Sequence, residues 1–184
     1  MKYSRKLILK DGRECCLRNG TKEDGGAVLE NFRLVHEQTD FLLSYPEELS
    51  MTSGEEGEFL EKAAESENSA ELLAEVEGRI AGLAGVHPVG ERKKLRHRAE
   101  LGISLDRSFW GLGIGRALLD ACIECAENAG YRQLELSVVS GNERAIELYR
   151  RAGFVEYGRN PKGFLMRTGE FQELVLMQRE LRER

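Results

Sequence analysis

A glycine-rich segment near the middle of the chain has the composition of an anion-binding loop. Gly111, Gly113 and Gly115 alternate with two apolar residues and come directly before a strongly helical stretch. Glycines keep side chains away from such a bend, so successive backbone N–H groups can converge on an anion at the amino terminus of the helix. Each exposed contact of this kind contributes only about 0.3–1 kcal/mol, so several donors must act together. The segment predicts a site for a ligand that carries a pyrophosphate.

Two well-known phosphate-binding loops have a different spacing. A dinucleotide-binding loop requires Gly-x-Gly-x-x-Gly, and counting from Gly111 places Arg116 where the third glycine belongs. A nucleoside-triphosphate loop requires Gly-Lys followed by Ser or Thr, which the sequence does not contain. Judged by itself, the segment is also compatible with a glycine turn whose role is purely structural.

Two polar residues, Asn142 and Tyr149, lie on a predicted helix that comes after a predicted strand. The strand that starts at Leu134 ends near Ser140, and Asn142 then begins a helix that Gly153 ends. Tyr149 lies about two helical turns after Asn142, so the two side chains lie on nearly the same face. The helix therefore presents an amide and a phenol to one side.

Together these segments resemble the GCN5-related N-acetyltransferase (GNAT) superfamily, in its small bacterial-type members. The resemblance is strong over residues 99–156 and covers the rest of the chain through the order of its elements. It implies an α/β (α+β) fold, with a mixed, mostly antiparallel sheet of about six to seven strands and about four flanking helices. Two central strands of that sheet splay apart in a V. The matching features are Glu100 to Leu105, the loop Gly111 to Gly115, Asn142 with Ala145, and Tyr149 with Gly153-Phe154.

The resemblance implies that acetyl-CoA binds as a co-substrate and that no metal is needed. The pantetheine would lie in the gap beside the strand that ends near Leu105, and Asn142 would bond the pantetheine amide. The pyrophosphate would lie on the glycine loop. The cofactor-binding residues implied in this way are Ile103, Ser104, Leu105, Gly111, Leu112, Gly113, Ile114, Gly115, Arg116, Asn142, Ala145 and Arg151.

Two residues of this region leave more than one interpretation open. For Arg151, contact with the adenosine 3′-phosphate and a helix-end position that favours the helix dipole are equally compatible. Trp110 stands where the family's loop usually begins with Gln or Arg. Its ring is expected either over the cofactor or in the core.

The implied reaction is direct attack of an amine on the thioester in a ternary complex, without an acyl-enzyme. Deprotonating a lysine-like amine at pH 7 costs about 4–5 kcal/mol, so a positioned base is useful. The resemblance assigns Tyr149 as the general acid for the CoA thiolate, and Glu100 is the candidate base. The alternatives are a Tyr149 that only packs against the sheet and a Glu100 that is only a solvated strand end.

Other positions for the base are weaker. Some branches of the superfamily place a carboxylate where this chain has Ser137, which cannot serve. Glu135, one step back on the same face of the strand as Ser137, is a weaker candidate. His97 would point to the face opposite Glu100 in a regular strand.

The acceptor is expected to be a primary amine of a small molecule or peptide. It would enter beside the first two helices, their connection from Phe41 to Pro46, and a turn near Asn160 to Phe164. The alternative function is a catalytically silent acyl-CoA sensor or scaffold module, which the presence of Tyr149 and a candidate carboxylate disfavours. Homodimers are common in the superfamily, although no apolar pattern in this chain requires one.

These motifs must be positioned by helices and strands. Hydrophobic periodicity and turn residues predict where those elements lie. Residues 88 to 98 form a basic loop, either a solvated hairpin tip or a contact for an acidic partner. The predicted strands are a hairpin over Leu7 to Leu17 with a tight turn at Asp11-Gly12, then Leu72 to Val76, Arg79 to Val86, Ala99 to Leu105, Leu134 to Val139 and Phe171 to Leu181. The predicted helices are residues 22 to 38, Gly54 to Glu67, Gly113 to Ala129 and Asn142 to Arg151.

Composition limits the remaining possibilities. A chain of 184 residues fits a single domain over residues 1–184. Its net charge of -5 provides no general field for nucleic acid, so no nucleic-acid partner is expected. No apolar run is long enough for a signal peptide or a membrane span, so we expect a cytoplasmic protein without a membrane partner. The four cysteines, expected to be reduced thiols, are Cys15, Cys16, Cys122 and Cys125.

Overall fold

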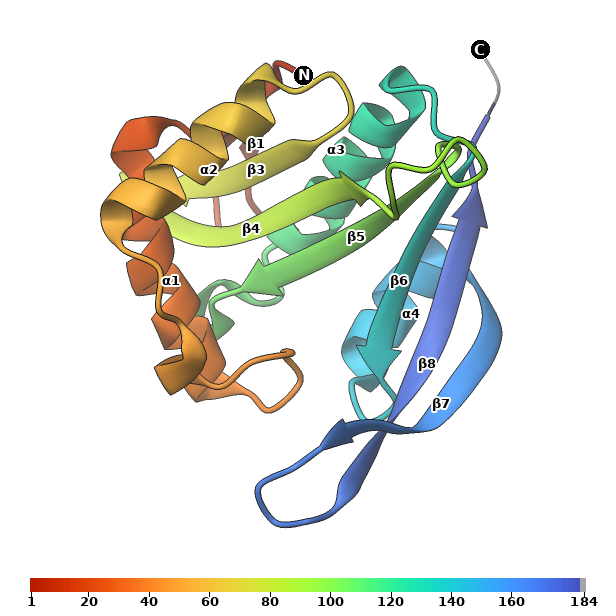
Figure 1. The fold of residues 1–184 in the computed structure, drawn as a ribbon. Helices are drawn as coiled ribbons and strands as arrows, with labels where there is room; N and C mark the ends of the chain where they lie inside the picture. The colour runs from red at the N-terminus through yellow and green to blue at the C-terminus, as the bar shows by residue number, and fades with distance from the viewer. Residues whose placement is uncertain (183–184) are drawn as a thin grey trace.

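The computed structural model describes residues 1–182, and its central feature is an eight-stranded sheet (Figure 1). The strands lie in the order β1-β2-β3-β4-β5-β6-β8-β7. Neighbouring strands are antiparallel except β5 and β6, so the sheet is mixed and mostly antiparallel, as predicted. The strands are β1 (Ser4–Ile8), β2 (Glu14–Asn19), β3 (Ala70–Val76), β4 (Arg79–Pro88), β5 (Arg98–Leu105), β6 (Gln133–Val139), β7 (Val155–Leu165) and β8 (Phe171–Glu180).

In the described part of the chain, α1 and α2 cover one face of the sheet, and α3 and α4 cover the other (Figure 1). Successive residues of β3 show the division, because side chains alternate along a strand. Leu72 belongs to the larger core under α3, whereas Leu73 belongs to a smaller cluster with Val28 and Leu60. The helices are α1 (Gly25–Gln38), α2 (Ser53–Glu65), α3 (Ile114–Asn128) and α4 (Glu143–Arg151), with short 3-10 turns at Lys22–Asp24, Pro46–Glu48 and Arg107–Phe109.

The strand β7 is the element that the sequence did not predict. Most of its residues are exposed, and Pro161 and Gly163 within it are typical of turns. β7 nevertheless pairs with β8, with an irregular register between Asn160 and Phe164. The prediction of a turn near Asn160 to Phe164 is therefore wrong. Those residues belong to the strand, and the chain reverses over residues 166–170.

The β3–β4 and β1–β2 hairpins have turns of different length. Glu77 and Gly78, between β3 and β4, have φ values of 52° and 76°, as a two-residue type I′ turn requires. The turn after β1 is longer than the predicted Asp11-Gly12 pair, since the N–H of Leu9 donates to the Arg13 carbonyl at 2.8 Å. Hydrogen bonding across residues 9–13 therefore sets the length of this loop.

Candidate active site

The strands β5 and β6 separate after a short parallel ladder. This ladder covers only residues 98–100 of β5 and 133–135 of β6. β5 continues to Leu105 while it pairs on its other side with β4, and β6 continues to Val139 beside β8. Among the described residues, the edge of β5 that faces β6 has no strand partner over residues 101–105, which include Ile103 and Ser104. Figure 1 shows the two strands diverging, so the predicted V-shaped splay is confirmed.

The loop between β5 and α3 bends at two glycines with left-handed backbone. Gly111 has a φ of 83° and Gly113 a φ of 102°, and α3 begins at Ile114, which is fully buried. Leu112 packs against the main core, and Gly115 lies in the first turn of α3. Within residues 1–182, no backbone amide from 111 to 116 donates to a backbone carbonyl. The loop therefore has a row of available amides at a helix amino terminus, which is the arrangement that anions prefer.

Trp110 packs across the start of this loop. Its Nε1 donates to the Leu105 carbonyl at 2.9 Å, so that carbonyl is already engaged within the chain. The guanidinium groups of Arg107 and Arg144 lie 5.4 and 4.8 Å from the centre of the ring. The half-buried ring thus makes cation–π contacts that connect the loop with α4.

The side chain of Asn142 caps the amino terminus of α4. Its Oδ1 accepts from the backbone N–H of Ala145 at 3.2 Å. This contact uses the oxygen of the amide group and the N–H of Ala145, and it leaves the Asn142 Nδ2 as the available donor. The expected bond from Asn142 to an amide carbonyl is compatible with this geometry, whereas Ala145 contributes through the cap.

Arg116, which the resemblance places at the pyrophosphate, lies next to Arg151, for which a contact with the 3′-phosphate is one of two interpretations. The Arg116 side chain pairs with Asp120 at 2.8 Å and also donates to the Arg151 carbonyl at 3.3 Å. The guanidinium of Arg151 pairs with Glu147 at 2.8 Å and is largely exposed. The structure therefore gathers two positive charges beside the start of α3, each already paired with one carboxylate.

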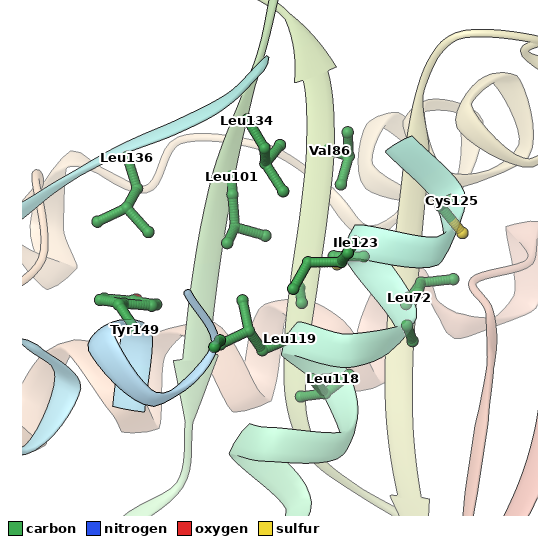
Figure 2. Packing of buried hydrophobic residues seen from close by; sticks show 14 of the residues in the cluster. Leu72, Val86, Leu101, Leu118, Leu119, Ile123, Cys125, Leu134, Leu136 and Tyr149 are labelled. Atoms are coloured by element: carbon green, nitrogen blue, oxygen red, sulfur yellow. The ribbon is translucent and has the colours of Figure 1, made fainter. Parts of the chain in front are cut away.

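Tyr149 is buried on the side of α4 that faces the sheet, and its exposed fraction is 8%. Figure 2 shows the ring near Leu136 and Leu119, and the ring of Phe154 lies 5.9 Å away. Burial raises the pKa of the Tyr149 phenol to about 12, with a smaller contribution from Cys122. The phenol therefore keeps its proton well above neutral pH, as a general acid must.

Glu100 and Glu135 are neighbours in the β5–β6 ladder but have different surroundings. Glu100 is exposed, whereas Glu135 is buried and accepts two hydrogen bonds from Arg98, one of them at 2.8 Å. These bonds hold the pKa of Glu135 below its usual value. Glu135 is therefore committed to an ion pair, Ser137 is exposed on the same strand, and Glu100 keeps a carboxylate open to a ligand.

Strand pairing assembles two polar groups that the sequence analysis did not identify. The buried carboxylate of Asp106, just after β5, accepts from Gln38 at 3.0 Å and from Arg79 at 2.5 Å, which fixes the end of α1 against the loop. On the strands beyond β5, Nε2 of His87 from β4 lies 2.6 Å from Oε1 of Glu71 from β3. Local patterns contain no signal for either contact, because the partners come from different strands and helices.

A cavity of about 180 Å³ lies where the α1–α2 connection meets the β7–β8 hairpin. The guanidinium of Arg167 stacks 3.8 Å from the centre of the Tyr45 ring and forms an ion pair with Glu47, which joins the two walls. A Cβ at Gly141 would lie 3.9 Å from the Phe41 ring, so this connection also reaches the residue before Asn142. The cavity is lined by Asp40, Leu42, Leu43, Ser44, Tyr45, Gly163, Phe164, Leu165 and Met166.

The four cysteines are free thiols. Burial raises the pKa of Cys15 and of Cys125 to about 11, which keeps both thiols protonated. Over residues 1–182, no group of three or more His, Cys, Asp or Glu side chains is placed to hold a metal ion. None of the helices described is long and apolar enough to cross a membrane.

Comparison with known proteins gives a consistent result. Residues 35–154 match the sequence profile of the Acetyltransferase (GNAT) family. The L-amino acid N-acetyltransferase AaaT of Escherichia coli (strain K12) is 27% identical over 167 residues, covering 90% of this chain and 98% of the relative.

Two solved structures show the same fold. The crystal structure of a GNAT-family acetyltransferase from Streptococcus pneumoniae superposes with a TM-score of 0.87 at 32% identity, covering 91% of this chain and 99% of that one. The structure of yncA, a putative acetyltransferase from Salmonella typhimurium with its cofactor acetyl-CoA, has a TM-score of 0.80 at 21% identity, covering 91% and 94%. Because the profile spans most of the chain and the fold recurs in these structures, the chain belongs to the GNAT acetyltransferase family.

Proposed function

We propose that the protein is an acetyl-CoA-dependent N-acetyltransferase that acts on a primary amine of a small molecule or peptide by direct attack in a ternary complex. The observation that carries this proposal is the end of the β5–β6 ladder at Glu100. Beyond it, an unpaired strand edge opens beside a loop of available amides. A strand edge binds an extended amide chain as an added strand, and helix-terminal amides bind phosphate.

The chain has residues that fit both the pantetheine arm and the diphosphate of acetyl-CoA. The backbone of Ile103 and Ser104, on the unpaired edge, would hold the pantetheine arm, and Nδ2 of Asn142 would donate to it. The amides of residues 111–116 would hold the diphosphate, with Arg116 and Arg151 adding positive charge nearby. Each of these arginines already has a carboxylate partner, so their contribution to phosphate binding is smaller than that of the loop amides.

Side chains near the splayed strands would supply an acid and a base. Acetyl-CoA supplies an activated acetyl thioester when bound. The exposed carboxylate of Glu100 would take the proton that the acceptor amine loses, directly or through water. Tyr149 would give its proton to the departing thiolate, and the N–H groups of the splayed strand would polarise the acetyl carbonyl.

The acceptor would enter from the side of the cavity that lies between the α1–α2 connection and the β7–β8 hairpin. That cavity combines apolar walls with one carboxylate, Asp40, which suits a cationic amine with an apolar substituent. AaaT is an L-amino acid N-acetyltransferase by name, so L-amino acids are the first acceptors to test.

Two measurements test the proposal. Thermal denaturation should show stabilisation by CoA and acetyl-CoA but not by NAD or ATP. Thiol release from acetyl-CoA should then depend on an amine, tested with L-amino acids, alkyl and aryl primary amines, polyamines and short peptides. Stabilisation by NAD or ATP alone would contradict the proposed site. Stabilisation by CoA without thiol release on any amine would instead indicate a silent acyl-CoA-binding module.

A further inference from the structure

His87 and Glu71 form a hydrogen-bonded pair on the face of the sheet that α1 and α2 cover. Nε2 of His87 lies 2.6 Å from Oε1 of Glu71, and the side chains are 32% and 13% exposed. The ring of Phe59, from α2, lies 6.0 Å from the imidazole. A carboxylate that binds one ring nitrogen fixes both the orientation and the tautomer of a histidine.

Gly85 provides the space for this pair. In the β3–β4 ladder Gly85 lies opposite Glu71, two residues before His87 and on the same face. A Cβ at Gly85 would lie 2.4 Å from Oε1 of Glu71 and 2.9 Å from Nε2 of His87. The hydrogen bond therefore occupies the position that a side chain at residue 85 would take.

The pair lies beside the candidate base. In the antiparallel β4–β5 ladder His87 is directly opposite Glu100, so their side chains share a face. Nε2 of His87 donates to the Glu71 carboxylate, which leaves the lone pair of the neutral ring at Nδ1. Among residues 1–182, Nδ1 of His87 has no hydrogen-bond partner. The imidazole thus has one nitrogen fixed by a carboxylate and one free to take a proton, next to Glu100.

We propose that His87, oriented by Glu71, receives at Nδ1 the proton that Glu100 takes from the acceptor amine. This inference depends on the proposed function. An N–H bond of the ammonium breaks as an O–H bond forms on Glu100, and that proton then moves to Nδ1 and leaves to water from the exposed part of the ring. Glu100 is thereby returned to its ionised form. His87 acts through Glu100 and is a positioning residue, not a catalytic one.

The charges around the ring favour such a role. The hydrogen bond that His87 donates to Glu71 raises the pKa of His87 above its usual value, burial opposes this, and the charges of Glu71 and Glu100 add to the increase. From α2, buried Glu56 also faces this cluster, and burial together with the charge of Glu71 raises the pKa of Glu56. The carboxylates that face the ring therefore strengthen its hold on a proton.

The test compares the pH dependence of kcat/KM between about pH 5.5 and 9 for three variants, with the amine that the acceptor panel shows to be turned over fastest. His87→Gln should lose the acidic limb that His87 controls and reduce kcat by about 100-fold at pH 7, with the KM for acetyl-CoA unchanged. Glu71→Gln should move that limb to lower pH, because the pKa of His87 falls. Gly85→Ala should act like Glu71→Gln, because the added Cβ separates the pair while both titrating groups remain.

His97→Gln is the matched control, since His97 is an exposed histidine outside the strand. Its pH profile should equal that of the wild type. Imidazole signals in an NMR titration give an independent reading, in which His87 should titrate at lower pH in Glu71→Gln. CoA-induced thermal stabilisation confirms that each variant is folded.

The outcomes separate the two proposals. An unchanged pH profile in a folded His87→Gln, or an unshifted His87 titration in Glu71→Gln, would overturn the relay while the acetyltransferase function stands. A wild-type protein that acetylates no amine would overturn the proposed function, and the relay with it.

Discussion

At the scale of single residues, Tyr149 offers the most direct test of acid catalysis. Burial raises the pKa of its phenol to about 12, so the proton to be donated is present at neutral pH. We expect Tyr149→Phe to lower kcat by about 100-fold while the KM for acetyl-CoA changes little, because only the hydroxyl is removed. Steady-state kinetics with saturating acetyl-CoA measures both quantities.

A second buried tyrosine provides the control for this substitution. Tyr131 is 4% exposed, and its hydroxyl donates to the Asn68 carbonyl at 2.8 Å, away from the splayed strands. Tyr131→Phe should lower the free energy of unfolding by about 1 kcal/mol and leave kcat unchanged. Equal kcat values for Tyr149→Phe and wild type would leave Tyr149 with a packing role only.

Glu135 should affect stability, in contrast to the exposed Glu100. The hydrogen bonds from Arg98 hold the pKa of Glu135 below its usual value. A carboxyl whose pKa is lower in the folded state stabilises the protein above its unfolded pKa of about 4.3, and this contribution disappears as the pH falls through the folded pKa. Glu135→Gln should thus lower the free energy of unfolding by about 1–3 kcal/mol at pH 7, and by less below about pH 4.

Urea denaturation at the two pH values measures this difference. Glu14→Gln is the control, because Glu14 pairs with Lys6 at 2.9 Å in a solvent-exposed position where such pairs contribute little. A loss for Glu135→Gln that does not depend on pH would contradict the assignment of Glu135 to a charged pair.

At the scale of an element, the amino terminus of α4 combines a structural and a binding role in one side chain. Oδ1 of Asn142 caps the helix, and Nδ2 is the donor proposed for acetyl-CoA. Asn142→Asp retains an oxygen for the cap and loses the donor, so it should keep the melting temperature and weaken acetyl-CoA binding by about 10-fold. Asn142→Ala loses both the cap and the donor, so it should weaken acetyl-CoA binding and also lower the free energy of unfolding by about 1 kcal/mol.

Calorimetric titration with acetyl-CoA and thermal denaturation separate these effects. If Asn142→Asp binds acetyl-CoA like the wild type, the side chain serves only as a cap.

The start of α3 depends on backbone conformation and not on side-chain space. A Cβ at Gly113 would meet nothing within 4 Å, yet the residue has a φ of 102°. Gly113→Ala should therefore cost about 1–2 kcal/mol of unfolding free energy through strain alone and weaken CoA binding as the loop relaxes. Gly54→Ala, in the first turn of α2 and equally unobstructed, should instead stabilise the protein by about 0.4–1 kcal/mol. Similar effects of both substitutions would show that the loop tolerates a side chain.

The bounds of α3 also show what the sequence could predict. The helix after the glycine loop is found within one residue of its expected start, because Gly113 and Gly130 bound an apolar repeat of helical period. β7 was missed because Pro161 and Gly163 are typical of turns, and the pairing with β8 overrides that preference. Local patterns specify a residue's own element, but the pairing of His87 with Glu71 depends on which strands become neighbours.

At the scale of the whole molecule, the sheet has two parts joined by little strand pairing. β1 to β5 form one part and β6 to β8 the other, and in the described part of the chain only residues 98–100 and 133–135 pair between them. Apolar packing continues across the division, since Leu101 and Leu136 belong to the same core cluster (Figure 2). A ligand arm in the splay would add hydrogen bonds where the ladder stops, so acetyl-CoA should act on the joint between the two parts.

Hydrogen exchange can detect this effect residue by residue. The amides of 101–105 that face β6, and those of 111–116, have no strand or helix acceptor in the described structure and should exchange fast. Acetyl-CoA at about 100 times its Kd should slow them by at least 10-fold and raise the global free energy of unfolding by about 2.7 kcal/mol. Amides on the outer edge of β1, which lies at the end of the strand order beside β2, should not gain local protection. Equal protection at both edges, or none at 101–105, would mean that the coenzyme does not lie between β5 and β6.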